Sequence, residues 1–385
     1  MILLNITKFV TPEIIFGNNA INQVGEACLR LGAKKVLVVS DSGVIEAGWM
    51  EKVIAICRQS GLRYTTFHEI TTNPKDYEVD LGVKVYQQEN CDAVIGVGGG
   101  SALDVAKAIA ILAANGGKIH DYEGVDQILH PLPPMVMVST TAGSGSEVSQ
   151  FAVIVDSKQA KKMTIVSKSL VPDIAIIDPY TLITKDQDLT ASNGMDVLTH
   201  AIEAYVSIAA TPLTDVQAKN AITLVAKYLR PSVASKTNEE AKNAMAMASL
   251  QGGLAFSNAI LGASHAMAHA IGGRYPLSHG DINAIMLPHV MNFNLIATPE
   301  RFRTIAELMG IDVRGMTDAQ AGKKAISQVV ELSKDIGTPQ RLSEMGLKDI
   351  DIEAMSQIAL EDACIITNPR DMSLKDIKQL FSLAL

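Results

Sequence analysis

Apolar runs alternate with helical patterns through the first half of the chain. Residues 35–40 (KVLVVS), 92–97 (DAVIGV) and 135–139 (MVMVS) are short and almost continuously apolar. Such segments are typical of strands that are buried on both faces of a parallel sheet. Helical spacing of apolar residues lies between them, near 45–60, 79–90 and 101–114. The alternation predicts an α/β fold with a doubly wound, Rossmann-like parallel sheet.

The pattern changes near residue 185. Before that point, FAVIVD (151–156) and MTIV (163–166) flank a polar stretch and predict a β-ribbon, and DIAIID (173–178) predicts a strand that ends at Pro179. After it, Ala, Met and Leu recur at helical spacing, as in 215–229 and 241–250. We therefore expect an α/β domain at 1–185 and an all-helical domain at 186–385.

Composition narrows the possible functions. The chain has 385 residues, 48% hydrophobic content and a net charge of −8, and no cluster of Lys and Arg is visible, which disfavours nucleic-acid binding. No apolar run approaches the length of a membrane span, and the N-terminus lacks the pattern of a signal peptide. The four cysteines are far apart, which favours a reduced, cytoplasmic setting.

One carboxylate and four histidines form two bursts in the second half: Asp196 and His200, then His265, His269 and His279. The first two pairs are spaced i, i+4, so on a helix each pair shares a face. A single histidine is more often a packed residue than a ligand, but the set as a whole predicts a site for iron(II) or zinc. At least one of the five must lie beside the metal if the ion is to keep a position open for substrate.

Two glycine-rich or serine-rich loops predict a phosphate-binding wall. In VIGVGGGSALDVAK (94–107), a strand runs into Gly98, Gly99 and Gly100 before Ser101 opens a helix, whose N-terminus favours a pyrophosphate. STTAGSGSE (139–147) follows the next strand and is placed as a second wall. Each loop alone is also compatible with an ordinary connection, and the spacing of the first is not GxGxxG.

Two single residues extend this cofactor hypothesis. Asp41 follows the strand at 35–40, where a carboxylate can accept hydrogen bonds from a ribose 2′-hydroxyl, although a helix N-cap explains it equally well. Asn73 precedes Pro74 in the connection that leads to the strand at 92–97 and is placed to contact adenosine, although Asn-Pro is also a common turn.

Together these motifs are similar to those of the iron-dependent (group III) alcohol dehydrogenases. The matching stretches are GGGS with DxxK (98–107), TTAGSGSE (140–147), GMDVLTHAIEAY (194–205), HAMAH (265–269), HG (279–280) and NPR (368–370). They follow one another along nearly the whole chain. Within the family, the chain resembles the NAD-linked branch of methanol and 1,3-propanediol dehydrogenases.

The resemblance implies a role for each matching position. It implies that Asp196, His200, His265 and His279 bind the metal, which is most often Fe²⁺ in the family, and that His269 lies beside it. Phe256 and Cys364 fall where the family lines its substrate pocket, and Phe151 completes an apolar lining. Ser144 stands in the cofactor loop where Thr is usual, Asn193 replaces a common Thr, and Leu-Ser precedes His279 instead of Pro. The implied cofactor contacts are Asp41, Asn73, Gly98, Gly99, Gly100, Ser101, Thr140, Thr141, Ser144 and Lys162.

The expected activity is hydride transfer between NAD and small primary alcohols or diols, with the reverse reduction of aldehydes. His269 either relays the proton or only holds a neighbouring group by a hydrogen bond. The alternative is an NAD- and metal-dependent sugar-phosphate cyclase or a glycerol-phosphate dehydrogenase-like enzyme, which needs basic residues for its substrate, and only Arg274 is close to the metal motifs. We expect a homo-oligomer without nucleic-acid or membrane partners.

Overall fold

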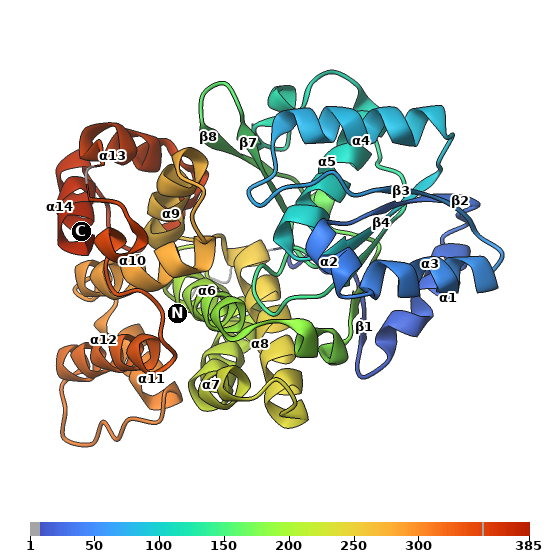
Figure 1. Cartoon of the computed structure of the whole chain (residues 1–385). Coiled ribbons are helices and arrows are strands. Elements are labelled where there is room, and N and C mark those ends of the chain that lie inside the picture. Colours follow the sequence, from blue (N-terminus) through green and yellow to red (C-terminus); the bar gives the residue numbers. More distant parts are fainter. Residues whose placement is uncertain (1–7, 349) are drawn as a thin grey trace.

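The computed structural model describes residues 8–348 and 350–385. Six parallel strands form the main sheet in the order β1-β9-β6-β4-β2-β3, and a smaller sheet has the order β5-β8-β7 (Figure 1). The strands are β1 (Glu13–Phe16), β2 (Lys35–Val39), β3 (Arg63–Phe67), β4 (Ala93–Gly98), β5 (Gly124–Val125), β6 (Met135–Ser139), β7 (Phe151–Asp156), β8 (Lys161–Val166) and β9 (Ile174–Ile177).

Helices cover both faces of the main sheet, so the predicted doubly wound fold is confirmed. Successive side chains of a strand point to opposite faces. On β2, Val36 and Val38 join the apolar cluster with α1 and α3, whereas Leu37 and Val39 join the cluster with α4 and α5. The helices of this half are α1 (Val24–Arg30), α2 (Ser42–Glu46), α3 (Trp49–Gln59), α4 (Asp76–Gln88) and α5 (Gly100–Asn115), with short 3₁₀ turns η1 (Ala20–Gln23) and η2 (Ile119–Tyr122).

The helix expected near 45–60 is confirmed as α3, and a separate short helix, α2, precedes it. Gly48 separates them with φ of 80°, a left-handed conformation that glycine adopts without the steric penalty of a side chain. The apolar pattern continues through the break because both helices pack on the same face of the sheet. The other expected helices of this half and the β-ribbon, whose strands β7 and β8 are antiparallel, are confirmed.

Helices make up the rest of the described chain after β9. The predicted change from α/β to helical structure is confirmed, because no described residue beyond Ile177 lies in a strand. The domain boundary at residue 185 itself stays a prediction. The 3₁₀ turn η3 (Lys168–Leu170) lies between β8 and β9, and the elements after β9 are η4 (Pro179–Thr184), α6 (Gln187–Val206), α7 (Pro212–Ala234), α8 (Glu239–Ala259), α9 (Ala263–Arg274), α10 (His279–Asn294), α11 (Pro299–Leu308), α12 (Asp318–Asp335), η5 (Leu342–Met345), α13 (Ile352–Glu361), η6 (Ala363–Thr367) and α14 (Leu374–Ala384).

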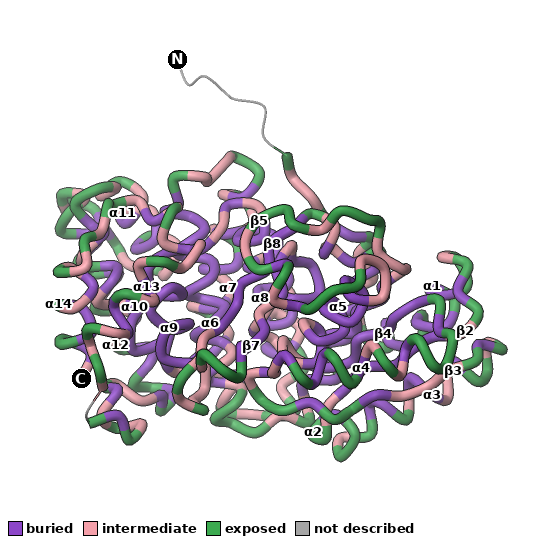
Figure 2. The backbone as a smooth tube through the Cα atoms, turned by 90° about the horizontal axis from the view of Figure 1, so that it is seen from above, coloured by how far each residue is buried: buried purple, intermediate pink, exposed green. Residues whose placement is uncertain are grey.

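Three of these helices run through the interior of the molecule. Figure 2 shows α6, α8 and α9 largely in the colour of buried residues. Within the described ranges, no single helix is long and apolar enough to cross a membrane. The pair α8 and α9 passes that test of length and composition only when taken together, and the two helices meet at a bend of 100°.

A close backbone approach joins the serine-rich loop to the helical half. Gly145 has φ of 61°, and a Cβ placed on it would lie 2.6 Å from the Cα of Gly253 on α8. Any side chain at either glycine would force the loop away from the helix. The two glycines therefore set the depth of the space that remains beside the loop.

Asp104 and Lys107, the two polar members of the DxxK motif on α5, hold the segment that leads into β7. The carboxylate of Asp104 accepts hydrogen bonds from the Ser146 hydroxyl and the Val153 N–H, at 2.5 and 3.0 Å. The fully buried Lys107 ammonium donates to the carbonyls of Ser149 and Phe151, at 2.9 and 2.8 Å. Burial lowers the pKa of Lys107 to about 8, while the charge of Asp104 opposes that shift. The motif thus fixes β7 and the adjoining loop against the first half.

Candidate active site

A cavity of about 540 Å³ is lined by residues of both halves of the chain. The α/β half contributes the loops after β2, β3, β4 and β6 together with the β-ribbon, and the helical half contributes α6, α8, α9 and α10. Loops at the carboxyl ends of parallel strands are the usual place for a ligand in a doubly wound fold. Of the residues singled out in the sequence, its wall includes Asp41, Asn73, Gly99, Gly100, Ser101, Thr141, Ser144, Phe151, Lys162, Asp196, His200, Phe256, His265, His269 and His279.

Three histidine rings converge on the carboxylate of Asp196. The Nε2 atoms of His265 and His279 lie 3.6 and 3.9 Å from its Oδ1, and the Nε2 of His200 lies 4.0 Å from its Oδ2. Asp196 and His200 share one face of α6, His265 lies in the first turn of α9, and His279 is the first residue of α10. The i, i+4 spacing acts as predicted within α6, but only the packing of three helices brings the four side chains together.

Glu203 fixes the orientation of His265. Its Oε2 lies 2.6 Å from the His265 Nδ1 and accepts from the N–H of Gly262 at 3.0 Å, while its Oε1 accepts from the N–H of Ser264 at 2.6 Å. This carboxylate from α6 therefore caps the start of α9 and holds the imidazole at the same time. Since an ionised carboxylate only accepts, Nδ1 carries a proton, and the opposite ring nitrogen, Nε2, faces Asp196.

The free ring nitrogen of His265 is the observation that tests whether this site fits a metal ion. Its Nε2 is buried without a hydrogen-bond partner in the structure. Buried polar atoms are rarely left unpaired. Two donors that each lie about 2.1 Å from one tetrahedral ion are about 3.4 Å apart, close to the separation of Nε2 of His265 from Asp196. The four residues therefore fit a divalent transition metal.

The charges within the cluster are strongly perturbed. Burial alone would raise the pKa of Asp196, but the neighbouring histidines hold it well below its usual range. Burial lowers the pKa of His200 to about 3, whereas the nearby carboxylates of Asp196 and Glu203 overcome burial and raise the pKa of His265 to about 9. A metal ion must therefore displace a proton from this group, as imidazole ligands generally require.

His269 lies beside the convergent rings and has a partner of its own. Its ring is stacked on that of His279 with the centroids 5.4 Å apart, and its Nδ1 lies 2.9 Å from the Oδ2 of Asp362. Burial opposes ionisation of Asp362, but His269 lowers the pKa of this carboxyl below its usual range. The carboxylate keeps the proton of His269 on Nδ1, so its Nε2 is left to accept a proton.

Sequence reasoning missed three of these polar partners: Glu203, Asn283 and Asp362. Glu203 follows His200 by three residues within the quoted THAIEAY motif, so its position on the same helix was available as a signal. Asn283 lies one helical turn after His279 and donates to Asp196 Oδ1 at 2.8 Å. Asp362 is distant in sequence from His269, and no local pattern connects them.

The two predicted loops face each other across the cofactor end of the cavity. Helix α5 begins at Gly100, so the backbone N–H groups of its first turn have no partner within the helix. A Cβ on Gly99 would lie 3.1 Å from Thr141, and one on Gly100 would lie 3.0 Å from Ser144. Glycine therefore allows the second loop to lie directly against the helix N-terminus, where a phosphate is favoured.

Asp41 caps a helix with one carboxylate oxygen, and its other oxygen is available for a ligand contact. Its Oδ1 accepts from the Val44 N–H at 3.0 Å and so caps α2, as one of the two alternatives proposed. Its Oδ2 lies beside Gly98, 3.3 Å from the place of a Cβ on that residue. Lys185 interacts electrostatically with Asp41 from the same cavity. The cap and a ligand contact are therefore compatible.

Three predicted site residues do not line the cavity. They are Gly98, Thr140 and Cys364. Gly98 ends β4, and its carbonyl accepts a hydrogen bond from the N–H of Thr140. Thr140 is fully buried. Cys364 is also fully buried and donates through its N–H to Asp362 at 2.8 Å, behind His269. The geometry thus gives no support to a direct ligand contact by these side chains. Their positions indicate instead that they shape the loops and the carboxylate behind the wall.

Aromatic rings border the histidine cluster. Phe256 is stacked on His200 with the ring centroids 4.4 Å apart, and it meets Phe151 edge to face at 5.7 Å. Burial of Lys162 lowers its pKa to about 8, and its charge interacts first with Asp196. The space next to the histidines is therefore bordered by the two phenylalanine rings and by the opposite charges of Lys162 and Asp196.

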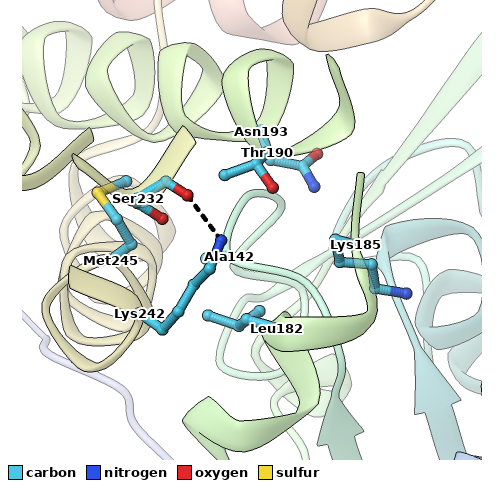
Figure 3. Close-up of a pocket in the computed structure, with 8 residues that line it drawn as sticks. All are labelled: Ala142, Leu182, Lys185, Thr190, Asn193, Ser232, Lys242 and Met245. Carbon is cyan, nitrogen blue, oxygen red and sulfur yellow. Dashed lines mark hydrogen bonds between the residues drawn. The ribbon is translucent and has the colours of Figure 1, made fainter. Parts of the chain in front are cut away.

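A second cavity of about 20 Å³ is lined by the eight residues drawn in Figure 3. Lys185 and Asn193 line both cavities. Lys242, which is buried there, donates to the carbonyl of Ser232 at 2.8 Å. A volume of this size holds about one water molecule, so the main cavity is the one that can accept a cofactor and an organic substrate.

Comparison with known proteins points to one family. The model described as "Iron-containing alcohol dehydrogenase" matches residues 11–179, and "Fe-containing alcohol dehydrogenase family, C-terminal" matches residues 190–385. The chain is 44% identical to the NAD-dependent methanol dehydrogenase of Bacillus methanolicus over 98% of this chain and 99% of that protein. It is also 44% identical to the 1,3-propanediol dehydrogenase of Klebsiella pneumoniae, over 97% of each.

A solved structure supports the same grouping. The crystal structure of a 1,3-propanediol oxidoreductase superimposes with a TM-score of 0.96 at 43% identity and covers 99% of this chain and 100% of that one. The likeness thus extends over both halves of the chain and includes the segments that form the cavity.

Proposed function

The chain belongs to the iron-containing alcohol dehydrogenase family, and we propose that its substrates are small uncharged primary alcohols or diols and the matching aldehydes. The protein is an NAD-linked alcohol dehydrogenase and aldehyde reductase of that family. The relatives named for methanol, 1,3-propanediol and lactaldehyde all have substrates of this size.

The observation that carries the proposal is the convergence of three imidazoles on Asp196 at the wall of the large cavity. We assign Asp196, His200, His265 and His279 as the residues that hold the iron. A metal ion held there would supply Lewis-acid chemistry toward the alcohol oxygen, and bound NAD would serve as the hydride acceptor.

The protein's own residues would supply binding, orientation and proton transfer. The N-terminus of α5 and the loop with Thr141 and Ser144 are assigned to the pyrophosphate and nicotinamide, since both offer N–H or hydroxyl groups to the cavity. His269 is assigned the proton, because Asp362 leaves its Nε2 free to accept. Phe151 and Phe256 would exclude water from the reacting atoms.

The charge of the cavity wall argues against anionic substrates. Four carboxylates line it, those of Asp41, Asp104, Asp186 and Asp196, against the two ammonium groups of Lys162 and Lys185. Lys162 and Lys185 already interact with Asp196 and Asp41, so a substrate phosphate or carboxylate buried here would lack a free lysine partner and would incur a substantial desolvation cost. This favours alcohol dehydrogenase activity over the sugar-phosphate alternative.

A substrate comparison tests the proposal. We expect kcat/KM for 1-propanol and 1,3-propanediol with NAD to exceed that for glycerol 1-phosphate and lactate by roughly 100-fold or more, the range that an unpaired buried charge implies. NADH formation followed by absorbance on the iron-loaded enzyme gives the four values. A preference for either anion would overturn the substrate proposal and move the chain toward the phosphate-handling alternative.

A second prediction concerns the choice of cofactor. A carboxylate beside the adenosine ribose repels a 2′-phosphate by about 1 kcal/mol or more, so the native enzyme should favour NAD over NADP at least about fivefold. Asp41→Gly should narrow that ratio, since Lys185 remains near the vacated place. The ratio of kcat/KM for NAD and NADP measures the change.

Asp41→Asn provides the matched control for the helix cap. Asparagine can still accept the hydrogen bond from the Val44 N–H but removes the charge. If charge sets the preference, both variants should shift the ratio, and the asparagine variant should keep the thermal stability of the native enzyme. Equal use of the two cofactors by the unmodified protein would refute the role of Asp41.

We also propose that the enzyme is a cytoplasmic homo-oligomer. The four buried free cysteines are consistent with a reducing compartment. Ile208 and Ile366 are exposed apolar side chains near one another, since the Ile208 N–H donates to the Thr367 carbonyl. Exposed apolar residues of this kind are frequent where subunits meet. Light scattering on the eluted protein would give the subunit number.

A further inference from the structure

A second group of metal-ligating side chains lies outside the cavity wall. Asp76 is the first residue of α4, His120 lies in η2, and Asp156 ends β7. The Nε2 of His120 is 3.2 Å from the Oδ2 of Asp76 and 3.4 Å from the Oδ2 of Asp156. All three donor atoms lie within 4.8 Å of one another. Three segments that are remote in sequence thus present one nitrogen and two oxygens to a common point.

Backbone N–H groups hold the two carboxylates through their other oxygens. The Oδ1 of Asp156 accepts from the N–H groups of Lys158 and Gln159, at 2.8 and 2.9 Å. The Oδ1 of Asp76 accepts from the Tyr77 N–H at 3.0 Å. Each carboxylate therefore keeps one oxygen aimed at His120. Ligand carboxylates in metalloproteins are commonly fixed by such outer hydrogen bonds.

The cluster places two buried carboxylates beside one imidazole. Asp76 and Asp156 are 8% and 4% exposed, and two carboxylates at such short range destabilise each other in their ionised forms. The adjacent lysines bond elsewhere: Lys75 donates to Thr71 and the Thr72 carbonyl, and Lys161 pairs with Glu123 at 2.9 Å. A protonated His120 would offset one of the two negative charges, whereas a divalent ion would offset both.

We propose that Asp76, His120 and Asp156 form a second metal site, which takes a divalent transition ion such as Mn²⁺ or Zn²⁺. The distances of 3.2 and 3.4 Å match donors that each lie about 2.0–2.2 Å from one ion. One imidazole with two carboxylates suits these ions better than calcium. The His120 side chain is 36% exposed, so water can reach the site and complete the coordination.

The proposed second site lies where a bound ion would stabilise the loop at the cofactor end of the cavity. Asp76 follows the loop of Thr72, Asn73 and Pro74, which lines the cofactor end of the cavity. The carbonyl of Pro74 accepts from the N–H of Val155 at 2.7 Å, so this loop is attached to β7 just before Asp156. An ion shared by Asp76 and Asp156 ties the loop to β7 a second time. Its removal should loosen the cofactor wall and leave the distant histidine cluster intact.

Metal stoichiometry on the full-length protein tests the proposal. The chelator-stripped protein is titrated with Mn²⁺ and with Zn²⁺ in separate experiments, and bound metal is measured by mass spectrometry and, for Mn²⁺, by electron paramagnetic resonance. We expect two equivalents per chain in the native protein, one in Asp156→Asn and one in His120→Ala. Asparagine at position 156 can still accept the N–H bonds of Lys158 and Gln159, so the turn is preserved.

Two further variants separate this site from the first one. His68→Ala, which removes an exposed histidine elsewhere in the α/β half, should keep two equivalents. His265→Ala should keep the ion at the second site while losing the one assigned to Asp196. The KM for NAD should rise several-fold in Asp156→Asn with kcat within about twofold of native. One equivalent in the native protein, or two in Asp156→Asn, would overturn the proposal, and neither result bears on the dehydrogenase activity itself.

Discussion

Replacing His265 by alanine should abolish most metal binding and, with it, nearly all turnover. The residue is fully surrounded by protein, its Nε2 has no hydrogen-bond partner, and it lies 3.6 Å from Asp196. Loss of a group that only orients a ligand costs about 10–100-fold in metal affinity, and loss of a ligand itself should cost more. Metal analysis of the purified variant, together with NADH formation from 1,3-propanediol, measures both effects.

Two control variants test whether the loss of metal and activity is specific to His265. His130→Ala removes an exposed histidine and should leave metal content and rate unchanged. Glu203→Gln keeps the shape beside His265 but removes the charge that holds its Nδ1 proton, so its metal affinity should fall between those of the native protein and His265→Ala. Undiminished metal and activity in His265→Ala would exclude His265 as a ligand.

The second large effect is expected at His269. If this histidine transfers the proton of the alcohol, His269→Ala should retain the metal, lower kcat by roughly 10²–10⁴-fold and change the pH profile of kcat. The structural reason is that Asp362 holds the Nδ1 proton at 2.9 Å and leaves Nε2 free to accept. Steady-state rates across pH 5–9, with metal content determined on the same samples, separate chemistry from binding.

Asp362→Asn sharpens that experiment. The amide can still contact the Nδ1 of His269, but it no longer stabilises a protonated ring, so kcat should fall less than in His269→Ala while the pH profile moves. A purely orienting histidine would instead lower metal affinity by about 10–100-fold in His269→Ala and leave the pH profile of the metal-loaded enzyme unchanged. A variant with normal metal, rate and profile would eliminate both roles.

The strands that the sequence revealed are those with apolar residues on both faces. β2, β4 and β6 lie in the middle of the sheet, and their unbroken apolar runs follow directly from burial by helices on each side. Arg63–Phe67 and Glu13–Phe16 form the two edges, where one side of the strand is open. Their mixed composition gave no such run, so neither segment was identified as a strand by its residues.

The candidate ligands were visible for a different reason. A metal requires side chains of a few types, and a helix repeats its face every three to four residues, so pairs such as Asp196 and His200 stand out in the sequence. The groups that support them do not stand out. Asp362 and Glu203 are ordinary acidic residues until tertiary packing places their carboxylates 2.9 and 2.6 Å from imidazole nitrogens.

The sequence by itself determined the class of fold, the change from α/β to helical character near residue 185, and the residue types available for metal and phosphate binding. These follow from local periodicity and from the chemistry of single side chains. The tertiary structure decided which residues face the cavity, and Thr140 and Cys364 do not line it. It also brought Asp76, His120 and Asp156 together. Finally, it left one ring nitrogen of His265 without a hydrogen-bond partner. Those outcomes depend on how segments from distant parts of the chain pack against one another. A local sequence pattern does not contain that information, because it relates only residues that are close together in the chain.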